Sequence, residues 1–268
     1  MSAIRRNRIL ETLKVHGRVS FSQLAEELDV SEETVRRDIK HLISKGVVEP
    51  VRGGAALPEV LRVAAFHECL TEQAEEKKII ANLAAQLVKS GDTIMIGGGS
   101  TTAYFSLALR SHMNLTIVTN SVDAARILTT SGGNKVFTVG GKLDERSGSV
   151  MGMMAANDFK LFAVEKAFFS VGWLTARNGL MCDTLEEVEC WRAMMSCAGK
   201  AIALVDSSKF GKRGLFKAAA LEEVDILVTD KRPALDVEEA LTNAGCDLVY
   251  QGRQVSQVAP SAAAAAIA

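Results

Sequence analysis

Several features that mark other classes of protein are missing from this sequence of 268 residues. Its five cysteines include no Cys-x-x-Cys pair and no histidine at ligand spacing, so neither a disulfide framework nor a metal site is indicated. Its apolar runs are broken by charge or glycine well before membrane-spanning length, and no apolar segment follows the arginines of residues 1–8. These absences predict a cytoplasmic protein with reduced thiols, no membrane-spanning segment and no secretory signal.

A strong net charge is missing too. The chain has 31 Lys and Arg against 32 Asp and Glu, a net charge of −1, which by itself predicts no polyanionic partner. Residues 1–56 carry a balance of +2 and the remainder −3. Because this difference is small, the argument for any charged partner depends on where the charges lie within the predicted helices.

The length and the 48% of hydrophobic residues suit one small domain followed by a large one. We predict domain boundaries at 1–57 for the small domain, 58–73 for a linker, 74–256 for the large domain and 257–268 for a flexible alanine-rich tail. The linker contains Pro58 and no clean periodicity.

The first 56 residues contain three short amphipathic segments. Ser20 and Ser31 stand where N-caps of the second and third helices belong. The apolar residues that recur at helical spacing are Ile4, Ile9, Leu10 and Leu13 in the first segment, Phe21, Leu24, Ala25 and Leu28 in the second, and Val35, Ile39, Leu42 and Ile43 in the third. Two short strands are expected after them, at Val47–Val48 and near Val51, before Gly53-Gly54. This order predicts a winged helix-turn-helix.

The third predicted helix presents a basic face. Val35 and Ile39 face inward, which leaves Arg36, Arg37 and Lys40 outside, next to Thr34. A solvated helix face would show similar charges, but the preceding buried helix and tight turn favour DNA binding. Thr34 with Arg36 or Arg37 would reach base edges, while Lys40 and an arginine in the wing would meet phosphates. The predicted DNA-binding residues are Ser31, Thr34, Arg36, Arg37, Lys40 and Arg52.

The stretch "RNRILETLKVHGRVSFSQLAEELDVSEETVRRDIKHLISKGVVEPVRGGA" resembles the N-terminal domain of DeoR-type bacterial transcriptional regulators. The resemblance is long, and the "VSEETVRRDI" run is its most specific part. It departs in the wing, where these proteins usually have an Arg shortly before His-Gly-Gly. Here Glu49-Pro50 and Arg52 occupy that stretch, so the family's wing contacts carry over only to Arg52.

After a helix expected from residue 74, apolar runs of strand length alternate with helical segments. The predicted strands are Thr93–Ile96, Leu115–Val118, Lys135–Val139, Ala167–Val171, Ala201–Val205, Ile226–Thr229 and Leu248–Tyr250. The predicted helices between them are Thr102–Arg110, Val122–Leu128, Leu185–Ala198 and Val237–Ala244. Continuous apolar strands with intervening helices predict a Rossmann-like α/β domain with a largely parallel sheet.

Small, donor-rich or charged residues follow four of these strands, where open α/β sheets bind ligands. Glycine lets backbone N–H groups approach an anion, and a helix N-terminus favours one. The spacing fits neither G-x-G-x-x-G nor a P-loop, so a phosphorylated sugar or polyol is a better candidate than a nucleotide, and no cofactor is predicted. The predicted effector-binding residues are Gly98, Gly99, Ser100, Thr101, Thr102, Asn120, Ser121, Gly141, Asp206 and Lys209.

Segments such as "GSTTAYFSLAL", "TNS", "VGGK" and "VDSSKFG" resemble the effector domain of the same DeoR-type regulators. That domain is similar in fold to ribose-5-phosphate isomerase. The resemblance implies ligand contacts at Gly99, Ser100, Thr101, Asn120, Ser121, Gly141 and Lys209. Two positions depart from the family pattern: Gly97 stands where an Asp is common, and Cys69 where an Arg is common.

Three functions remain open for the large domain. A sugar-phosphate isomerase with an appended DNA-binding domain would need a carboxylate base, and the isomerase family's carboxylate and lysine-glycine stretches are not found. Asp144-Glu145 and Glu186-Glu187 are the remaining carboxylate pairs. A module for oligomerisation alone would leave the donor-rich strand ends unexplained. We therefore predict a regulator without catalytic residues, acting as a homo-oligomer (dimer or tetramer) on operator DNA and more consistent with a repressor of sugar or polyol catabolism.

Overall fold

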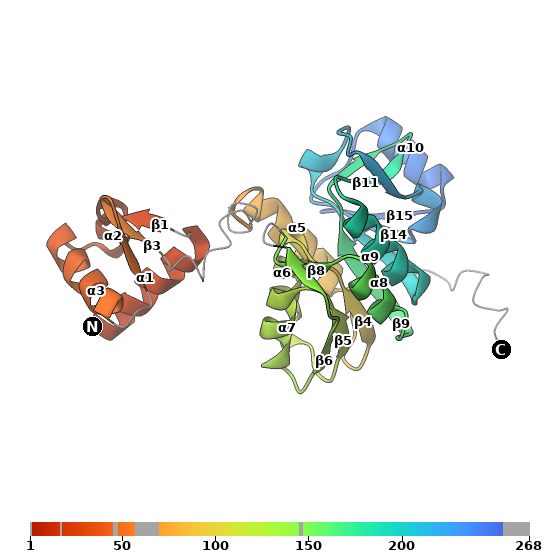
Figure 1. Ribbon diagram of the computed structural model, residues 1–268. Coiled ribbons are helices and arrows are strands. Elements are labelled where there is room, and N and C mark those ends of the chain that lie inside the picture. The colour runs from red at the N-terminus through yellow and green to blue at the C-terminus, as the bar shows by residue number, and fades with distance from the viewer. Residues whose placement is uncertain (1, 17, 45–47, 57–69, 145–146, 254–268) are drawn as a thin grey trace. The chain divides into compact units, whose positions relative to one another are not determined.

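The computed structural model describes residues 2–16, 18–44, 48–56, 70–144 and 147–253 (Figure 1). The chain divides into two units, Met1–Glu72 and Gln73–Ala268. Val47, Cys69, residues 58–69 of the predicted linker and the predicted tail lie outside the described residues.

Among the described residues up to 56, the first unit has three helices and a small sheet. The helices are α1 (Ser2–His16), α2 (Phe21–Leu28) and α3 (Glu32–Ser44). Ser20 begins α2 through a capping box with Gln23, and Asp29 ends it in the left-handed conformation, with φ of 51°. The helices enclose an apolar core that includes the fully buried Ile9 and Leu24. This unit has the predicted winged helix-turn-helix fold.

The predicted positions of the wing strands need correction. The wing is a hairpin of β2 (Glu49–Val51) and β3 (Gly54–Ala56), and β3 also pairs with β1 (Arg18–Ser20), all antiparallel. The second wing strand thus begins at Gly54, after the turn at Gly53, instead of preceding both glycines. Gly53 makes the turn with φ of +79°, and a Cβ at Gly54 would lie 2.1 Å from the carbonyl oxygen of Val19. Gly54 is therefore a strand residue that must be small because β1 lies directly against it.

A parallel sheet of seven strands forms the second unit, in the order β15-β14-β12-β9-β4-β5-β6. Their bounds are β4 (Thr93–Ile96), β5 (Thr116–Thr119), β6 (Lys135–Thr138), β9 (Val164–Ser170), β12 (Ala198–Leu204), β14 (Ile226–Val228) and β15 (Asp247–Val249). All seven predicted strands are found, with bounds that differ by at most three residues. The α/β fold class is confirmed.

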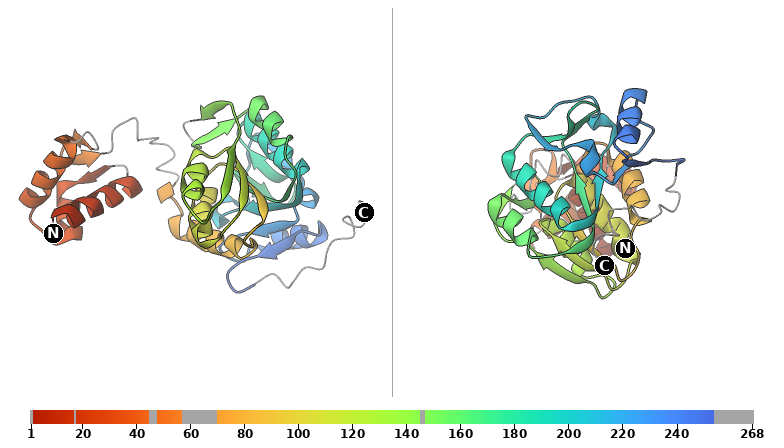
Figure 2. Two further views of the ribbon diagram at one scale, coloured as in Figure 1. Left: turned by 90° about the horizontal axis from the view of Figure 1, so that it is seen from below. Right: turned by 90° about the vertical axis from the view of Figure 1, so that its right-hand side faces the viewer.

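Helices cover both faces of this sheet (Figures 1 and 2). One face carries α5 (Ala74–Ala85), α6 (Ser100–Ala108) and α7 (Val122–Thr129), whose apolar residues pack with Ile94 and Phe168. The other carries α8 (Met153–Phe159), α9 (Leu185–Ser196) and α10 (Leu235–Asn243), which pack with Met95 and Phe169. Adjacent strand residues thus serve opposite cores, because successive side chains of a strand point to opposite faces.

Several short elements have no counterpart in the prediction. They are the hairpin of β7 (Lys142–Asp144) and β8 (Ser149–Met151), helix α8, η3 (Ser207–Lys209), η4 (Leu221–Glu223), and the antiparallel sheet of β10 (Trp173–Thr175), β11 (Gly179–Cys182) and β13 (Phe216–Ala219). Each strand among them has at most four residues, which is too short for a clear alternation of apolar and polar positions. The predicted helix Thr102–Arg110 ends as η2 (Leu109–Ser111).

The cysteines within the described residues are free thiols. Cys182, Cys190 and Cys246 are buried, and burial raises the pKa of the Cys182 and Cys246 thiols to about 12 and that of Cys190 to about 11. These three thiols are therefore protonated near neutral pH and pack as small apolar groups. In the same part of the chain, no cluster of metal-ligating side chains occurs and no helix is long and apolar enough to cross a membrane.

Candidate functional site

The outward face of α3 is the first candidate site. Val35, Ile39 and Leu42 are buried in the core of the first unit, and this orientation leaves Arg37 and Lys40 exposed on the opposite side of the helix. Among the described residues neither side chain forms an ion pair or hydrogen bond. Two unpaired cations on one exposed helix face can contact phosphates and base edges without first breaking a bond within the protein.

Arg36 lies differently from its neighbour Arg37. Its guanidinium carbon is 4.2 Å from the ring centroid of Phe21, and its Nη2 donates to Glu32 Oε2 at 3.1 Å. Phe21 is the first residue of α2, so Arg36 lies on the flank of α3 where the two helices meet. Of the two predicted arginines, Arg36 is therefore held by contacts within the protein, whereas the Arg37 side chain makes no ion pair or hydrogen bond among the described residues.

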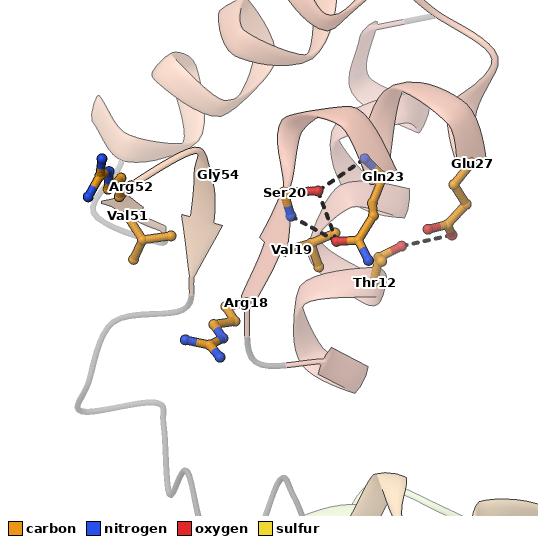
Figure 3. A pocket seen from close by; sticks show the side chains of 9 residues that line it. All are labelled: Thr12, Arg18, Val19, Ser20, Gln23, Glu27, Val51, Arg52 and Gly54. Carbon is orange, nitrogen blue, oxygen red and sulfur yellow. Dashed lines mark hydrogen bonds between the residues drawn. The ribbon is translucent and has the colours of Figure 1, made fainter.

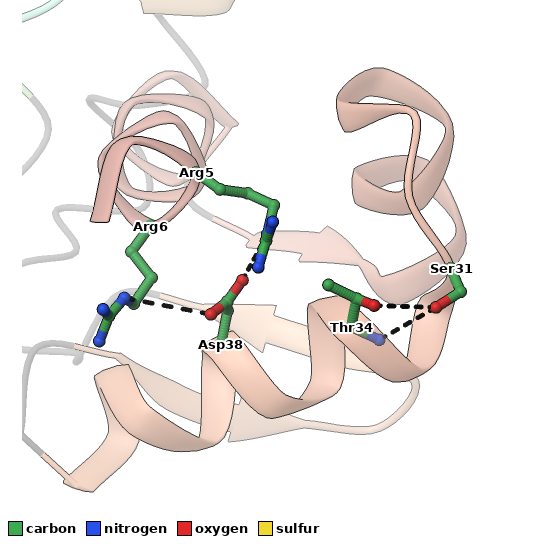
Figure 4. Close-up of polar contacts among 5 residues, drawn as sticks. All are labelled: Arg5, Arg6, Ser31, Thr34 and Asp38. Atoms are coloured by element: carbon green, nitrogen blue, oxygen red, sulfur yellow. Dashed lines mark hydrogen bonds and ion pairs between the residues drawn. The ribbon is translucent and has the colours of Figure 1, made fainter. Parts of the chain in front are cut away.

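The N-terminus of α3 is fixed by its own hydroxyl groups (Figure 4). Ser31 Oγ accepts a hydrogen bond from the backbone N–H of Thr34 at 3.3 Å and lies 2.9 Å from Thr34 Oγ1. This is the predicted cap, and it holds both hydroxyl groups at the exposed start of the helix. Their contact with DNA stays a prediction.

Sequence reasoning missed Asp38, which is buried on the inward face of α3. Its carboxylate accepts from Arg5 Nε at 2.5 Å and lies 4.0 Å from Arg6 Nε, so two arginines of α1 bind one carboxylate of α3 (Figure 4). Its position, three residues after Val35 and one before Ile39, was the available signal, because a carboxylate among inward-facing apolar residues requires a buried partner.

The wing turn is tied to the start of α2. The backbone N–H of Phe21 donates to the carbonyl oxygen of Gly53 at 3.0 Å, which fixes the exposed Arg52 beside α2. A groove of about 770 Å³ lies behind this turn (Figure 3). It is lined by Thr12, Arg18, Val19, Ser20, Gln23, Glu27, Val51, Arg52 and Gly54. Arg18 and Arg52 lie toward one end and Glu27 at the other, where it accepts from Thr12 Oγ1 at 3.0 Å.

The second candidate site lies where the strand order of the large sheet reverses. From β4 the chain proceeds to β5 and β6 on one side, and it later returns to β9 and continues outward on the other. The carboxyl ends of β4 and β9 therefore form a topological switch point, which is where open α/β sheets bind ligands. The predicted glycine loop 97–99 follows β4 at this point.

Close packing requires glycine at two positions of this loop. A Cβ at Gly98 would lie 1.6 Å from Ser149 Oγ, and one at Gly99 would lie 2.3 Å from Ser170 Oγ. Gly99 also has φ of +130° and is the N-cap of α6, with no side chain capping the first turn. The first N–H groups of α6 thus have no side-chain acceptor, which is the arrangement that binds anions at helix N-termini.

Asn120 supplies a polar atom next to the loop. Its side chain is 3% exposed, and its Nδ2 donates to the carbonyl oxygen of Val150 at 2.9 Å. Within the described part of the chain its Oδ1 is buried without a partner, and it lies 3.7 Å from where a Cβ of Gly98 would stand. A buried acceptor without a donor is costly, so a ligand with a hydroxyl group would relieve it.

Other predicted effector residues have local roles. Ser121 caps α7 by accepting from the N–H of Ala124 at 3.2 Å, and Thr102 Oγ1 donates to Gly99 O at 2.9 Å. The buried Asp206 caps η3 and accepts from Ser208 N and Oγ. Gly141 has φ of +139°, and a Cβ there would lie 2.8 Å from Val150 Cγ1. These contacts explain why these residue types occur at the four positions, and no bound ligand is needed for that explanation.

Ser100, Thr101 and Lys209 have no such local explanation. Ser100 is half-buried and Thr101 is buried in the first turn of α6, and no hydrogen bond of either side chain is found among the described residues. Lys209 follows β12, and its Nζ lies 5.0 Å from the ring centroid of Trp173. Their roles as ligand contacts stay predictions.

The position of Gly97 is closed by apolar atoms. A Cβ there would lie 3.2 Å from Cβ of Phe169 and 3.4 Å from Sδ of Met194. Both neighbours are fully buried in the core on the α9 side of the sheet. An aspartate at this position would bury its carboxylate against a thioether and an aromatic residue, which explains the small residue here.

One carboxylate of each pair that an isomerase could use is engaged in local structure. Asp144 Oδ1 accepts from Ser147 N at 2.8 Å and from Ser147 Oγ at 2.7 Å in the β7–β8 turn, and Glu145 lies outside the described residues. Glu187 accepts from Thr184 Oγ1 at 3.1 Å at the start of α9, and burial raises its pKa above the usual value. The turn therefore explains the carboxylate of Asp144, and the helix cap explains that of Glu187.

Two family matches cover most of the chain. Residues 5–60 match the DeoR-like helix-turn-helix domain, and residues 72–231 match the DeoR C terminal sensor domain. The chain is 30% identical over 239 residues to the glycerol-3-phosphate regulon repressor of Escherichia coli (strain K12), covering 89% of this chain and 95% of that protein. It is 31% identical over 245 residues to the HTH-type transcriptional repressor GlcR of Bacillus subtilis (strain 168), covering 90% and 93%.

These matches define a DNA-binding transcriptional regulator with a C-terminal sensor domain. The chain belongs to the DeoR family, as its motifs predicted. Among solved structures, a D-ribose-5-phosphate isomerase in complex with phospho-erythronic acid is similar, with a TM-score of 0.38 and 22% identity, over 51% of this chain and 54% of that one.

Proposed function

We propose that this regulator is a repressor of genes for sugar or polyol catabolism, and that a small phosphorylated sugar or polyol bound to the large domain changes its affinity for DNA. The observation that carries the proposal is the uncapped N-terminus of α6 with the unpartnered Oδ1 of Asn120 beside it, at the switch point of the sheet. The printed name of one relative, the glycerol-3-phosphate regulon repressor, adds support because it includes a phosphorylated polyol.

On the DNA side, α3 enters the major groove. Arg37 and Thr34 read base edges, whereas Lys40 and Arg52 bind phosphates. Ser31 holds the start of the helix, and Arg36 keeps α3 against Phe21 of α2. The free side chains of Arg37 and Lys40 support this division of roles.

On the ligand side, the phosphate binds the N–H groups of the first turn of α6, together with the hydroxyl groups of Ser100 and Thr101. Asn120 Oδ1 accepts a hydrogen bond from a hydroxyl group of the sugar. Lys209 supplies positive charge from the end of β12. The remaining predicted residues shape the loops that hold these groups.

The two functions are linked through a homo-oligomer, because helix-turn-helix proteins read repeated half-sites with paired domains. Ligand binding shifts the population between arrangements of the paired domains that fit operator DNA and arrangements that do not. The free energy of this shift is limited to the difference between the free energies with which the ligand binds the two arrangements.

A thermal-shift screen tests the ligand half of the proposal. We expect glycerol 3-phosphate, ribose 5-phosphate or glucose 6-phosphate to raise the Tm of the full-length protein, while glycerol, ribose and glucose have no effect at equal concentration. The double variant Ser100→Ala/Thr101→Ala should lose the response and keep its Tm without ligand. An unchanged response in this variant would refute the proposed phosphate position, and no response to any phosphorylated sugar or polyol would refute the effector class.

A further inference from the structure

Trp173 begins β10, three residues after the end of β9, and its indole ring is held from several sides. Its Nε1 donates to Asp183 Oδ1 at 3.1 Å. The loop after β12 folds against the ring: a Cβ at Gly214 would lie 2.7 Å from Trp173 Cδ1. The side chain therefore has one fixed position at the carboxyl edge of the large sheet.

Two lysines of the same loop lie against this ring. Lys209 Nζ is 5.0 Å and Lys212 Nζ is 5.4 Å from the ring centroid, distances at which an ammonium group is attracted to an indole. Within the described residues neither ammonium group has a carboxylate partner, and the neighbouring Arg213 is exposed without one. Because the ammonium groups of Lys209 and Lys212 at this ring repel each other, an anion bound there would be stabilised by both.

The position of this cluster relative to the glycine loop follows from the strand order. The glycine loop follows β4, Trp173 follows the adjacent β9, and Lys209 follows β12, the next strand along. Neighbouring strands lie about 4.8 Å apart, so the carboxyl ends of β4 and β12, which lead into the glycine loop and the lysine loop, are about 10 Å apart along one edge of the sheet. A small extended molecule spans this distance.

We infer that Trp173, Lys209 and Lys212 form a second anion subsite, and that the effector is a small sugar or polyol derivative with an anionic group at each end. This inference rests on the proposed function, since it takes the first anionic group to be the phosphate at α6. The second group is a phosphate or a carboxylate, which share the charge and the acceptor oxygens that lysine binds. Lys212 then determines specificity for doubly anionic ligands over singly anionic ones.

Tryptophan fluorescence gives a direct readout of this subsite. The chain has two tryptophans, and the other, Trp191, is buried between α9 and the sheet. A Trp191→Phe variant leaves Trp173 as the sole indole. We expect its emission to change on titration with fructose 1,6-bisphosphate or 6-phosphogluconate. The second anionic group is a phosphate in the first ligand and a carboxylate in the other, so the two titrations show which group the subsite prefers. Fructose 6-phosphate should bind at least tenfold more weakly. Isothermal titration calorimetry on the wild-type protein gives the same affinities without the substitution.

The Lys212→Gln variant should lose this tenfold preference and bind fructose 6-phosphate as the wild-type protein does. Lys217→Gln is the matched control, because Lys217 is exposed on β13 and makes no contact with the ring of Trp173. Equal affinity of the wild-type protein for mono- and bisphosphate, or an unchanged preference in Lys212→Gln, would overturn the inference and leave the proposed function standing. Failure of every phosphorylated ligand to bind would instead refute the proposed function.

Discussion

The two candidate sites present their charge in different ways. The proposed DNA-binding surface consists of long side chains, Arg37 and Lys40, that project from one helix and are exposed. The proposed ligand site consists of backbone N–H groups at the start of α6, after Gly98 and Gly99, and is bordered by the buried Asn120. The first surface is built from residues three apart in sequence, while the second is assembled from strand ends that are distant in sequence.

Because of this difference, substitutions at the first site should change mainly binding, whereas substitutions at the second should change both binding and stability. Removing an exposed side chain from α3 deletes a contact with DNA and changes little within the protein. The glycines of the ligand site are packed against Ser149 and Ser170, so any side chain there disturbs the fold as well as the site. Substitutions in the two regions should therefore give distinct combinations of affinity and stability.

Asp38 is the exception within the DNA-binding unit, and its substitution should have the largest effect. The Asp38→Ala variant leaves Arg5 and Arg6 without their shared carboxylate, and we expect a loss of about 3 kcal/mol in the stability of this unit. Hydrogen–deuterium exchange of α3 amides in the full-length protein measures it. Glu33→Ala, an exposed carboxylate of the same helix, is the control and should change exchange little. Equal exchange in both variants would show that the Asp38 ion pairs contribute nothing.

Gly98→Ala tests the opposite side of the comparison. The new Cβ would overlap both Oγ and Cβ of Ser149, and we expect the second unit to lose about 2–3 kcal/mol together with its ligand response. Denaturant unfolding and the thermal shift with ligand measure the two losses. Gly172→Ala is the control in the same unit, because a Cβ there would lie 3.4 Å from its nearest neighbour, the carbonyl oxygen of Met181. Adding Ser149→Gly to Gly98→Ala should restore stability. Wild-type stability in Gly98→Ala itself would contradict the packing argument.

The smallest effect should separate Arg37 from Arg36. Arg37→Ala should weaken binding to DNA selected by the wild-type protein from a random library by about 1–3 kcal/mol, or roughly 5- to 150-fold. Arg36→Ala should cost less, because Arg36 already binds Phe21 and Glu32. Fluorescence anisotropy at fixed salt gives both affinities, and neither variant should alter the ligand response. A larger loss for Arg36 than for Arg37 would reverse the assigned roles.

Regular periodicity explains why so much of the fold could be predicted. The helices of the first unit and all seven strands of the large sheet show long or strongly apolar patterns. The second strand of the wing was predicted at the wrong position. In the sequence Gly53 suggests that the last strand has ended, but in the structure it forms the turn of a hairpin and a further strand follows. The β7–β8 hairpin was missed for a similar reason: three-residue strands carry too little pattern, yet Ser149 of this hairpin is what confines Gly98.

By itself the sequence determined the two domains, the basic recognition helix, the parallel sheet and the glycine loop after β4, because each depends on residues close together in the chain. The side chains that are free to bind follow from the folded structure. Arg36 contacts Phe21, Asp38 is buried against α1, and two lysines lie at Trp173. Among the described residues, Asn120 Oδ1 has no hydrogen-bond partner. These outcomes depend on contacts between distant segments, and such contacts leave no periodic signal in the sequence.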